Sequence, residues 1–142
     1  MALRFGFKAV AGFLLPPLGL RFGVRAPLTA TVLLLLAATA WGWMVPGYLF
    51  LIAFGLMGAG ELGGGYFPNY VVAISPAGTG SRNLALVNLA LPAGSMAPAL
   101  YGHITDLYGF SASFAVGILA ALLALHLSVG LPVGPAVSDG TT

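Results

Sequence analysis

Long uncharged apolar stretches alternate with short polar connectors along this chain. A helix needs about 20 apolar residues to cross the roughly 30 Å of hydrocarbon in a bilayer. Four stretches reach that length, and we interpret them as membrane-spanning helices over residues 27–45, 47–74, 84–103 and 110–131. The connectors are short and rich in Gly, Pro, Ser or Asp, so successive spans are expected to lie antiparallel in one bundle. The pattern predicts an all-α integral membrane fold, with residues 1–142 forming a single membrane domain.

The two ends of the chain depart from this pattern. Residues 9–20 are apolar but too few to span, and the Pro16-Pro17 pair would break or kink a helix. We expect a partial helix there, which is either partly inserted, lies along the interface, or is the stump of a longer helix. A cleavable signal peptide is the alternative reading of this basic and then apolar N-terminus. Residues 132–142 form a polar tail that is expected to be disordered.

Composition supports a membrane protein and excludes several other classes. Of 142 residues, 59% are hydrophobic and 6% are charged, whereas a soluble domain has about 25% charged residues. A water-soluble fold of this size could not cover its surface with so few charges. Cysteine is absent, which excludes disulfides, a thiolate nucleophile and a cysteine metal site. The basic residues are scattered, without the stripe that would indicate nucleic-acid binding.

The arginines predict the topology. Arg21 and Arg25 flank the start of the first full span, and Arg82 follows the second span. An even number of crossings separates these sites, so both can form cytoplasmic loops, as expected from the excess of basic residues on that side. The C-terminus would also be cytoplasmic, in a plasma or inner membrane. Arg4 and Lys8 do not fit, because they would lie outside if residues 9–20 crossed the membrane.

One carboxylate, Glu61, lies in the middle of the otherwise uncharged run "LIAFGLMGAGELGGGYFPNYVVAI". Placing a charge at the centre of a spanning helix costs roughly 2.5–3.5 kcal/mol on insertion scales, so such residues usually face protein or water. Near mid-depth, Glu61 could couple transport to protons or pair with a substrate cation. It could instead be a protonated acid that hydrogen-bonds another helix and holds the bundle together.

Small and polar residues around Glu61 extend the candidate site. The glycines Gly60, Gly63, Gly64 and Gly65 are expected to let helices pack closely, or to form a hinge. The residues predicted to line a substrate or ion path with Glu61 are Tyr66, Asn69, Asn88 and Ser95. Each of these four has an ordinary alternative role, as an interface anchor or an interhelical hydrogen-bonding group.

No arrangement of residues suggests catalysis. His103 and Asp106 are three residues apart but lack a third metal ligand. No Ser-His-Asp order, paired catalytic carboxylates or His-rich cluster occurs in the sequence. We therefore expect neither an enzyme, nor a cofactor, nor a metal.

Three segments resemble carriers of the major facilitator superfamily. "NLALPAGSMAPALYGHITDLYGFSASF" is similar to their eleventh and twelfth helices. "ISPAGTGSRNLAL" resembles the cytoplasmic loop before the eleventh helix, and "GLRFGVRAPL" resembles the basic loop between the eighth and ninth. The residues that match the first motif are Pro98, Gly102, Asp106, Gly109 and Phe114.

The resemblance covers about residues 10–131 and implies the C-terminal part of a twelve-helix carrier. It also implies that residues 47–74 and 84–103 border a central cavity while the spans at 27–45 and 110–131 are peripheral. Where the family's basic loop usually carries an Asp, this chain has Leu20, so a charge relay in that loop is not carried over. Such carriers have two six-helix halves, so the chain would be a truncated product, a fragment or one piece of a split carrier.

Three functional hypotheses follow. The first is part of a secondary transporter that moves a small, unidentified solute by alternating access, with or without proton coupling. It would need further helices from another chain, a homo-oligomer or a longer parent protein. The second is a structural or assembly subunit of the membrane without transport activity of its own. The third is a compact four-helix carrier that acts as a homodimer.

Overall fold

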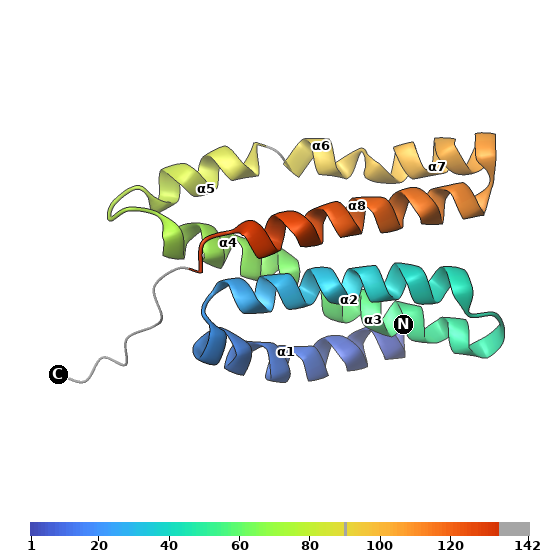
Figure 1. Cartoon of the computed structure of the whole chain (residues 1–142), viewed down its shortest axis with the longest axis horizontal. Helices are drawn as coiled ribbons and strands as arrows, with labels where there is room; N and C mark the ends of the chain where they lie inside the picture. The colour runs from blue at the N-terminus through green and yellow to red at the C-terminus, as the bar shows by residue number, and fades with distance from the viewer. Residues whose placement is uncertain (90, 134–142) are drawn as a thin grey trace.

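The computed structural model describes residues 1–89 and 91–133, and these residues form helices joined by turns, with no strand among them (Figure 1). The predicted disordered tail falls largely on residues 134–142, which lie outside the described residues. The elements are α1 (Ala2–Phe22), α2 (Arg25–Met44), the 3₁₀ helix η1 (Gly47–Leu51), α3 (Ile52–Gly60), α4 (Gly63–Ile74), α5 (Gly80–Asn88), α6 (Leu91–Ser95), α7 (Ala97–Tyr108) and α8 (Phe110–Gly130).

Four of these segments are long and apolar enough to cross a membrane. They are α1, α2, the continuous run Gly47–Ile74 formed by η1, α3 and α4, and α8. The predicted spans 27–45, 47–74 and 110–131 coincide with the last three. The chain is therefore all-helical and has the helices that an integral membrane protein requires.

The prediction of a partial helix over residues 9–20 was wrong. Residues 2–22 form one helix of 21 residues that continues through Pro16 and Pro17, and it is itself long enough to span. Packing explains the difference, because Ala11 and Leu15 are buried against Ala59 of α3. Contacts with a neighbouring helix can compensate for the hydrogen bonds that prolines remove.

The prediction of one continuous helix over residues 84–103 was wrong for the part of this segment that the structure describes, residues 84–89 and 91–103. The structure instead has the three shorter helices α5, α6 and α7 in this region. Pro92 is the second residue of α6, and Pro98 is the second residue of α7. Proline is tolerated in the first turn of a helix but not in its interior, so these two residues restart the helix rather than continue it.

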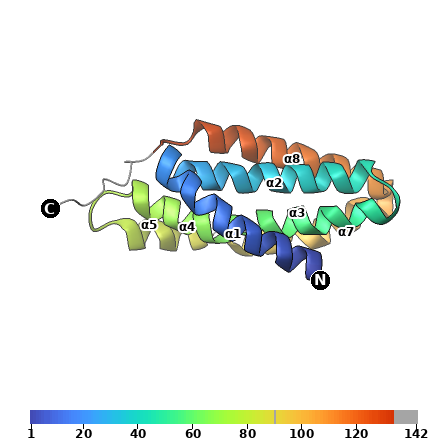
Figure 2. The same cartoon turned by 90° about the horizontal axis from the view of Figure 1, so that it is seen from below.

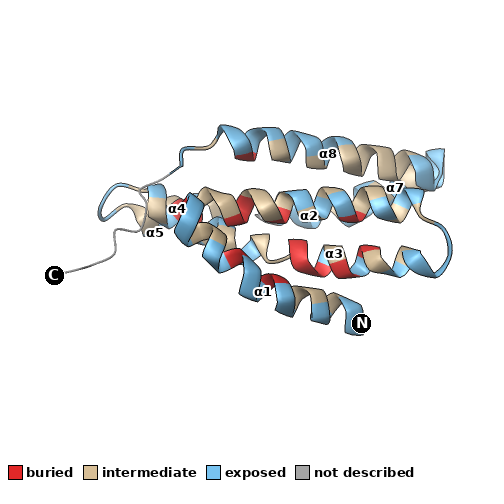
Figure 3. Ribbon diagram, turned by 60° about the horizontal axis from the view of Figure 1, so that its bottom comes forward, coloured by how far each residue is buried: buried red, intermediate tan, exposed pale blue. Residues whose placement is uncertain are grey.

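Helices α1, α2 and α3 pack against one another, and the remaining elements pack around this group. In Figure 2, α1 crosses the bundle obliquely while α2 and α8 run side by side, in agreement with their contacts. Helix α7 packs on α8, and α5 packs on α4. Figure 3 shows that buried residues concentrate on facing sides of α1, α2, α3 and α4, whereas α7 and α8 are largely exposed.

Candidate functional site

Glu61 lies at a local interruption of the second long apolar run. It follows α3, and Leu62 precedes α4. The Glu61 amide donates to the Met57 carbonyl, four residues back, at 3.0 Å, but the Leu62 and Gly64 amides donate to carbonyls only three residues back, at 3.3 and 3.1 Å. The helix therefore tightens to 3₁₀ geometry for one turn, a feature that is often found at hinges.

Two basic side chains of α1 meet this carboxylate. The Arg4 guanidinium forms an ion pair with Glu61, and its Nε donates to Glu61 Oε2 at 3.3 Å. Lys8 Nζ lies 3.6 Å from the same oxygen. The side chains are 41%, 40% and 29% exposed for Arg4, Lys8 and Glu61 respectively, so the described helices do not fully enclose any of the three. We refer to these three residues as the charge cluster.

The cluster forms because glycines let α1 approach α3 closely. A Cβ on Gly58 would overlap the backbone carbonyl oxygen of Arg4, and a Cβ on Gly55 would lie 2.8 Å from the Phe7 ring. Side chains at these two positions would push α1 away. Because Arg4 and Lys8 are one helical turn apart, both then face the same side of α3.

The four glycines that the sequence singled out divide into two pairs. A Cβ on Gly60 would lie 2.6 Å from Leu35 Cγ of α2, and a Cβ on Gly63 would lie 2.8 Å from Thr31 Oγ1. Gly64 and Gly65 have no such neighbour within 4 Å. The first pair lies in the contact with α2, and the second faces open space.

The predicted path residues form no hydrogen bond with the charge cluster in the described part of the chain. Tyr66 packs on the small core of Ala11, Leu15 and Ala59. Asn69, Asn88 and Ser95 are exposed, and Ser95 Oγ donates to the Pro92 carbonyl within its own helix at 2.7 Å. Within residues 1–89 and 91–133, none of these four side chains hydrogen-bonds to the cluster.

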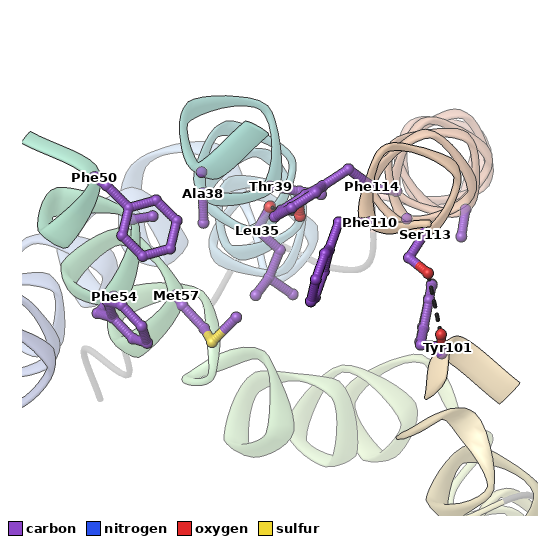
Figure 4. A pocket seen from close by; sticks show the side chains of 15 residues that line it. Leu35, Ala38, Thr39, Phe50, Phe54, Met57, Tyr101, Phe110, Ser113 and Phe114 are labelled. Atoms are coloured by element: carbon purple, nitrogen blue, oxygen red, sulfur yellow. Dashed lines mark hydrogen bonds between the residues drawn. The ribbon is translucent and has the colours of Figure 1, made fainter. Parts of the chain in front are cut away.

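An apolar cavity of about 560 Å³ lies between α2, α3, α7 and α8 (Figure 4). Its walls are mainly apolar and include Leu35, Ala38, Phe50, Phe54, Met57 and Phe114. Its polar residues are Thr39, Tyr101 and Ser113. Ser113 Oγ is already engaged, because it donates to the Tyr101 carbonyl at 3.0 Å. A volume of this size is typical of small-molecule sites.

The cavity and the charge cluster are adjacent along α3. Phe50, Phe54, Met57 and Glu61 follow one another at spacings of four, three and four residues, which places them on one helical face. The first three line the cavity. The wall of the cavity therefore ends one helical turn before the carboxylate.

The arginines of the predicted cytoplasmic loops lie at one end of the bundle. Figure 1 shows three segments there: the α1–α2 junction, the α4–α5 connection and the last turn of α8. Arg25 Nη1 donates to the carbonyls of Val129 and Leu131, both at 2.8 Å. A cation on the carbonyls of a helix C-terminus is favourable because these groups carry partial negative charge. Arg25 therefore fastens the end of α8 to the start of α2.

We expect Arg25→Met to release the end of α8 and to lower the free energy of unfolding by about 1–2 kcal/mol. Amide hydrogen exchange over residues 125–133 should become faster in this variant. Arg21→Met is the matched control, since the Arg21 guanidinium lies 5.3 Å from the ring of its neighbour Phe22 rather than on α8. Equal exchange rates in the two variants would contradict the role of Arg25.

The sequence interpretation missed Arg4 and Lys8 as partners of Glu61. Their spacing of four residues could have indicated a basic helical face. They were set apart because the N-terminal segment was read as a partial helix. A full helix places this basic face against the only acidic residue of the neighbouring run.

Comparison with protein-family models, with curated proteins and with solved structures found no match in any of the three searches.

Proposed function

We propose that the chain is a C-terminal part of a secondary transporter of the major facilitator type, which moves a small solute by alternating access with proton coupling. The main support for this proposal is the charge cluster of Arg4, Lys8 and Glu61. Ionisable groups inside spanning helices are rare, and they often mark substrate and proton pathways. Here three of them, from two helices, meet beside a helix interruption.

The interruption and the cavity support the same function. Transporter sites often lie near the bilayer midplane, where discontinuous helices expose backbone groups to a ligand. The tightened turn at Glu61 is a mild interruption of this kind, and the neighbouring apolar cavity offers room for a solute. Because α7 and α8 are largely exposed, further helices from another chain, a second copy or a longer parent protein would complete the bundle.

We expect Glu61→Gln to abolish solute-driven proton movement while leaving membrane insertion intact, because glutamine keeps the shape of the side chain but cannot carry the proton. The measurement uses vesicles that contain the chain, reconstituted together with the proteins that co-purify with it, and an internal pH-sensitive dye. Carboxylates, amino acids, sugars and quaternary amines are added outside, one class at a time. Arg82→Gln, at an exposed position, is the control. Unchanged proton movement in Glu61→Gln would rule out the coupling role.

The proposal includes an orientation with the arginine-bearing end in the cytoplasm of a plasma or inner membrane. The chain has no native cysteine, so a single cysteine placed at Arg82 can be labelled without background. We expect an impermeant maleimide to label it only after the cytoplasmic face is made accessible. Labelling from the outer face alone would reverse the orientation.

A second candidate function is a structural or assembly subunit. The observation that favours it is that Glu61 is already paired by Arg4 and Lys8, which is what a carboxylate that joins helices requires. Affinity purification from native membranes in mild detergent separates the two candidates. Stoichiometric capture of a larger complex, together with no solute-driven proton movement, would favour the assembly role.

A further inference from the structure

The charge cluster is not electrically balanced. Two cations, Arg4 and Lys8, face a single carboxylate, Glu61. The only other acidic residue in the described part of the chain is Asp106, which lies in α7. That helix packs on α8, whereas α1 packs on α2 and α3. One positive charge therefore remains in excess inside the spanning helices.

An excess cation in a low-dielectric region favours the uptake of an anion. Both basic side chains are about 40% exposed, so a ligand can reach them. The other groups that face Glu61 do not change this balance. From α2 the neighbours of the glycines on either side of Glu61 are Leu35 and Thr31, which carry no charge. Tyr66, the nearest ionisable residue on the same run, packs in the apolar core.

Protonation of Glu61 would allow an external anion to take the place of its carboxylate beside Arg4 and Lys8. When Glu61 is ionised, it occupies the two cations. If a monoanion takes its place, Glu61 accepts one proton from solution on its carboxylate, and the total charge of the cluster with its ligand is the same before and after. Taking up one proton with one monoanion thus adds no net charge to the membrane interior.

The neighbouring surface indicates what the rest of the ligand is. Phe54 and Met57 precede Glu61 on the same face of α3 and are each 45% exposed. They form part of the wall of the apolar cavity (Figure 4). A ligand whose anionic group reaches the charge cluster would place its body against these side chains.

We infer that the site binds an organic monoanion with an apolar body, and that it binds this ligand together with one proton. The inference rests on the proposed transport function and names its substrate class. Arg4 and Lys8 bind the anionic group, Glu61 holds the proton, and the apolar cavity receives the body.

Benzoate is a suitable probe because it joins one carboxylate to an apolar ring. The full chain in detergent is titrated by calorimetry in two buffers of different ionisation enthalpy, which gives the number of protons taken up. Benzyl alcohol and benzyltrimethylammonium, with similar bodies, are the neutral and cationic comparisons. We expect benzoate to bind with uptake of about one proton, and to bind roughly tenfold or more tightly than either comparison.

The variants assign the roles within the site. Glu61→Gln should bind benzoate at least as tightly as the original chain but without proton uptake, since the competing carboxylate is gone. Lys8→Gln should weaken benzoate binding roughly tenfold, and Lys8→Arg should restore it. Arg82→Gln should change nothing. Lys8→Arg preserves the positive charge. Recovery of benzoate binding in this variant would therefore show that Lys8→Gln weakens binding by losing the charge, and not by disturbing the fold.

Equal affinity for benzoate and benzyl alcohol, preference for the cation, binding without proton uptake, or no binding at all would overturn the inference. These results are separable from a failure of the transport proposal. If vesicles move a neutral or cationic solute in a way that depends on Glu61, transport stands and the substrate class is wrong. If benzoate binds with a proton but no solute moves protons in vesicles, the site is an anion site and the transport proposal fails.

Discussion

Gly58→Ala is expected to lower the free energy of unfolding by about 2–3 kcal/mol, because the added methyl group would overlap the backbone of Arg4. Backbone cannot move aside as the end of a side chain can, so α1 would have to shift away from α3. That shift would also separate Arg4 and Lys8 from Glu61. A local change in packing thus removes both a helix contact and the charge cluster.

Gly64→Ala is the matched control for this prediction. It lies in the same glycine-rich run, but a Cβ there meets nothing within 4 Å. Alanine is the better helix former by about 1 kcal/mol in water, so Gly64→Ala should be neutral or slightly stabilising. Thermal unfolding in detergent can be followed by tryptophan fluorescence, since Trp41 Nε1 donates to the Leu49 carbonyl at 2.8 Å, beside α3. Equal destabilisation by both variants would contradict the prediction that Gly58 is needed for the close contact between α1 and α3.

Reversing the charge at either end of the Arg4–Glu61 pair is expected to destabilise the fold strongly, whereas reversing both should restore much of it. Removing one partner of a fully buried ion pair costs about 3–5 kcal/mol. These side chains are 41% and 29% exposed, so we expect about 1–3 kcal/mol for Arg4→Glu and for Glu61→Arg. The double variant should recover at least half of the summed loss, because the ion pair forms again in the opposite direction.

Lys8 limits how complete the recovery is. It lies 3.6 Å from Glu61 in the original chain, so it would face an arginine at position 61 in the double variant. The comparison is made as a double-mutant cycle from the unfolding free energies of the four proteins, with Arg82→Glu as an exposed control. Strictly additive losses would show that the two residues do not interact.

The sequence was sufficient to predict the class of fold and most of its spans. Uncharged length alone identified α2, the run from η1 to α4, and α8, because bilayer thickness sets the length of a spanning helix. That Glu61 would need a partner was also predictable, since an acidic residue in such a run is costly when it is unpaired. Its partners were not, because pairing between residues 57 positions apart depends on tertiary packing.

The two errors in the helix assignment have one physical origin. The sequence interpretation treats Pro16 and Pro17 as helix breakers but predicts a continuous helix through Pro92 and Pro98, whereas the effect of a proline depends on the packing around it. In α1, burial of Ala11 and Leu15 against α3 maintains a helix through Pro16 and Pro17. In residues 84–103, where most side chains are exposed and α6 and α7 begin beside Pro92 and Pro98, no comparable packing opposes the break.

The hydrogen bonds from Arg25 to the end of α8 affect which end of the bundle can open. At that end of the bundle, Arg25 binds Val129 and Leu131, and the Tyr70 hydroxyl donates to the Pro132 carbonyl at 3.0 Å, so segments more than 60 residues apart are tied together. Away from that end, the hydrogen bond from Ser113 to Tyr101 joins the successive helices α7 and α8, and the ion pair of Arg4 with Glu61 joins the first turn of α1 to the end of α3. Parts of α2, α4 and the segment after α8 are therefore joined at the arginine-bearing end, and we expect this end to move least when the helices separate.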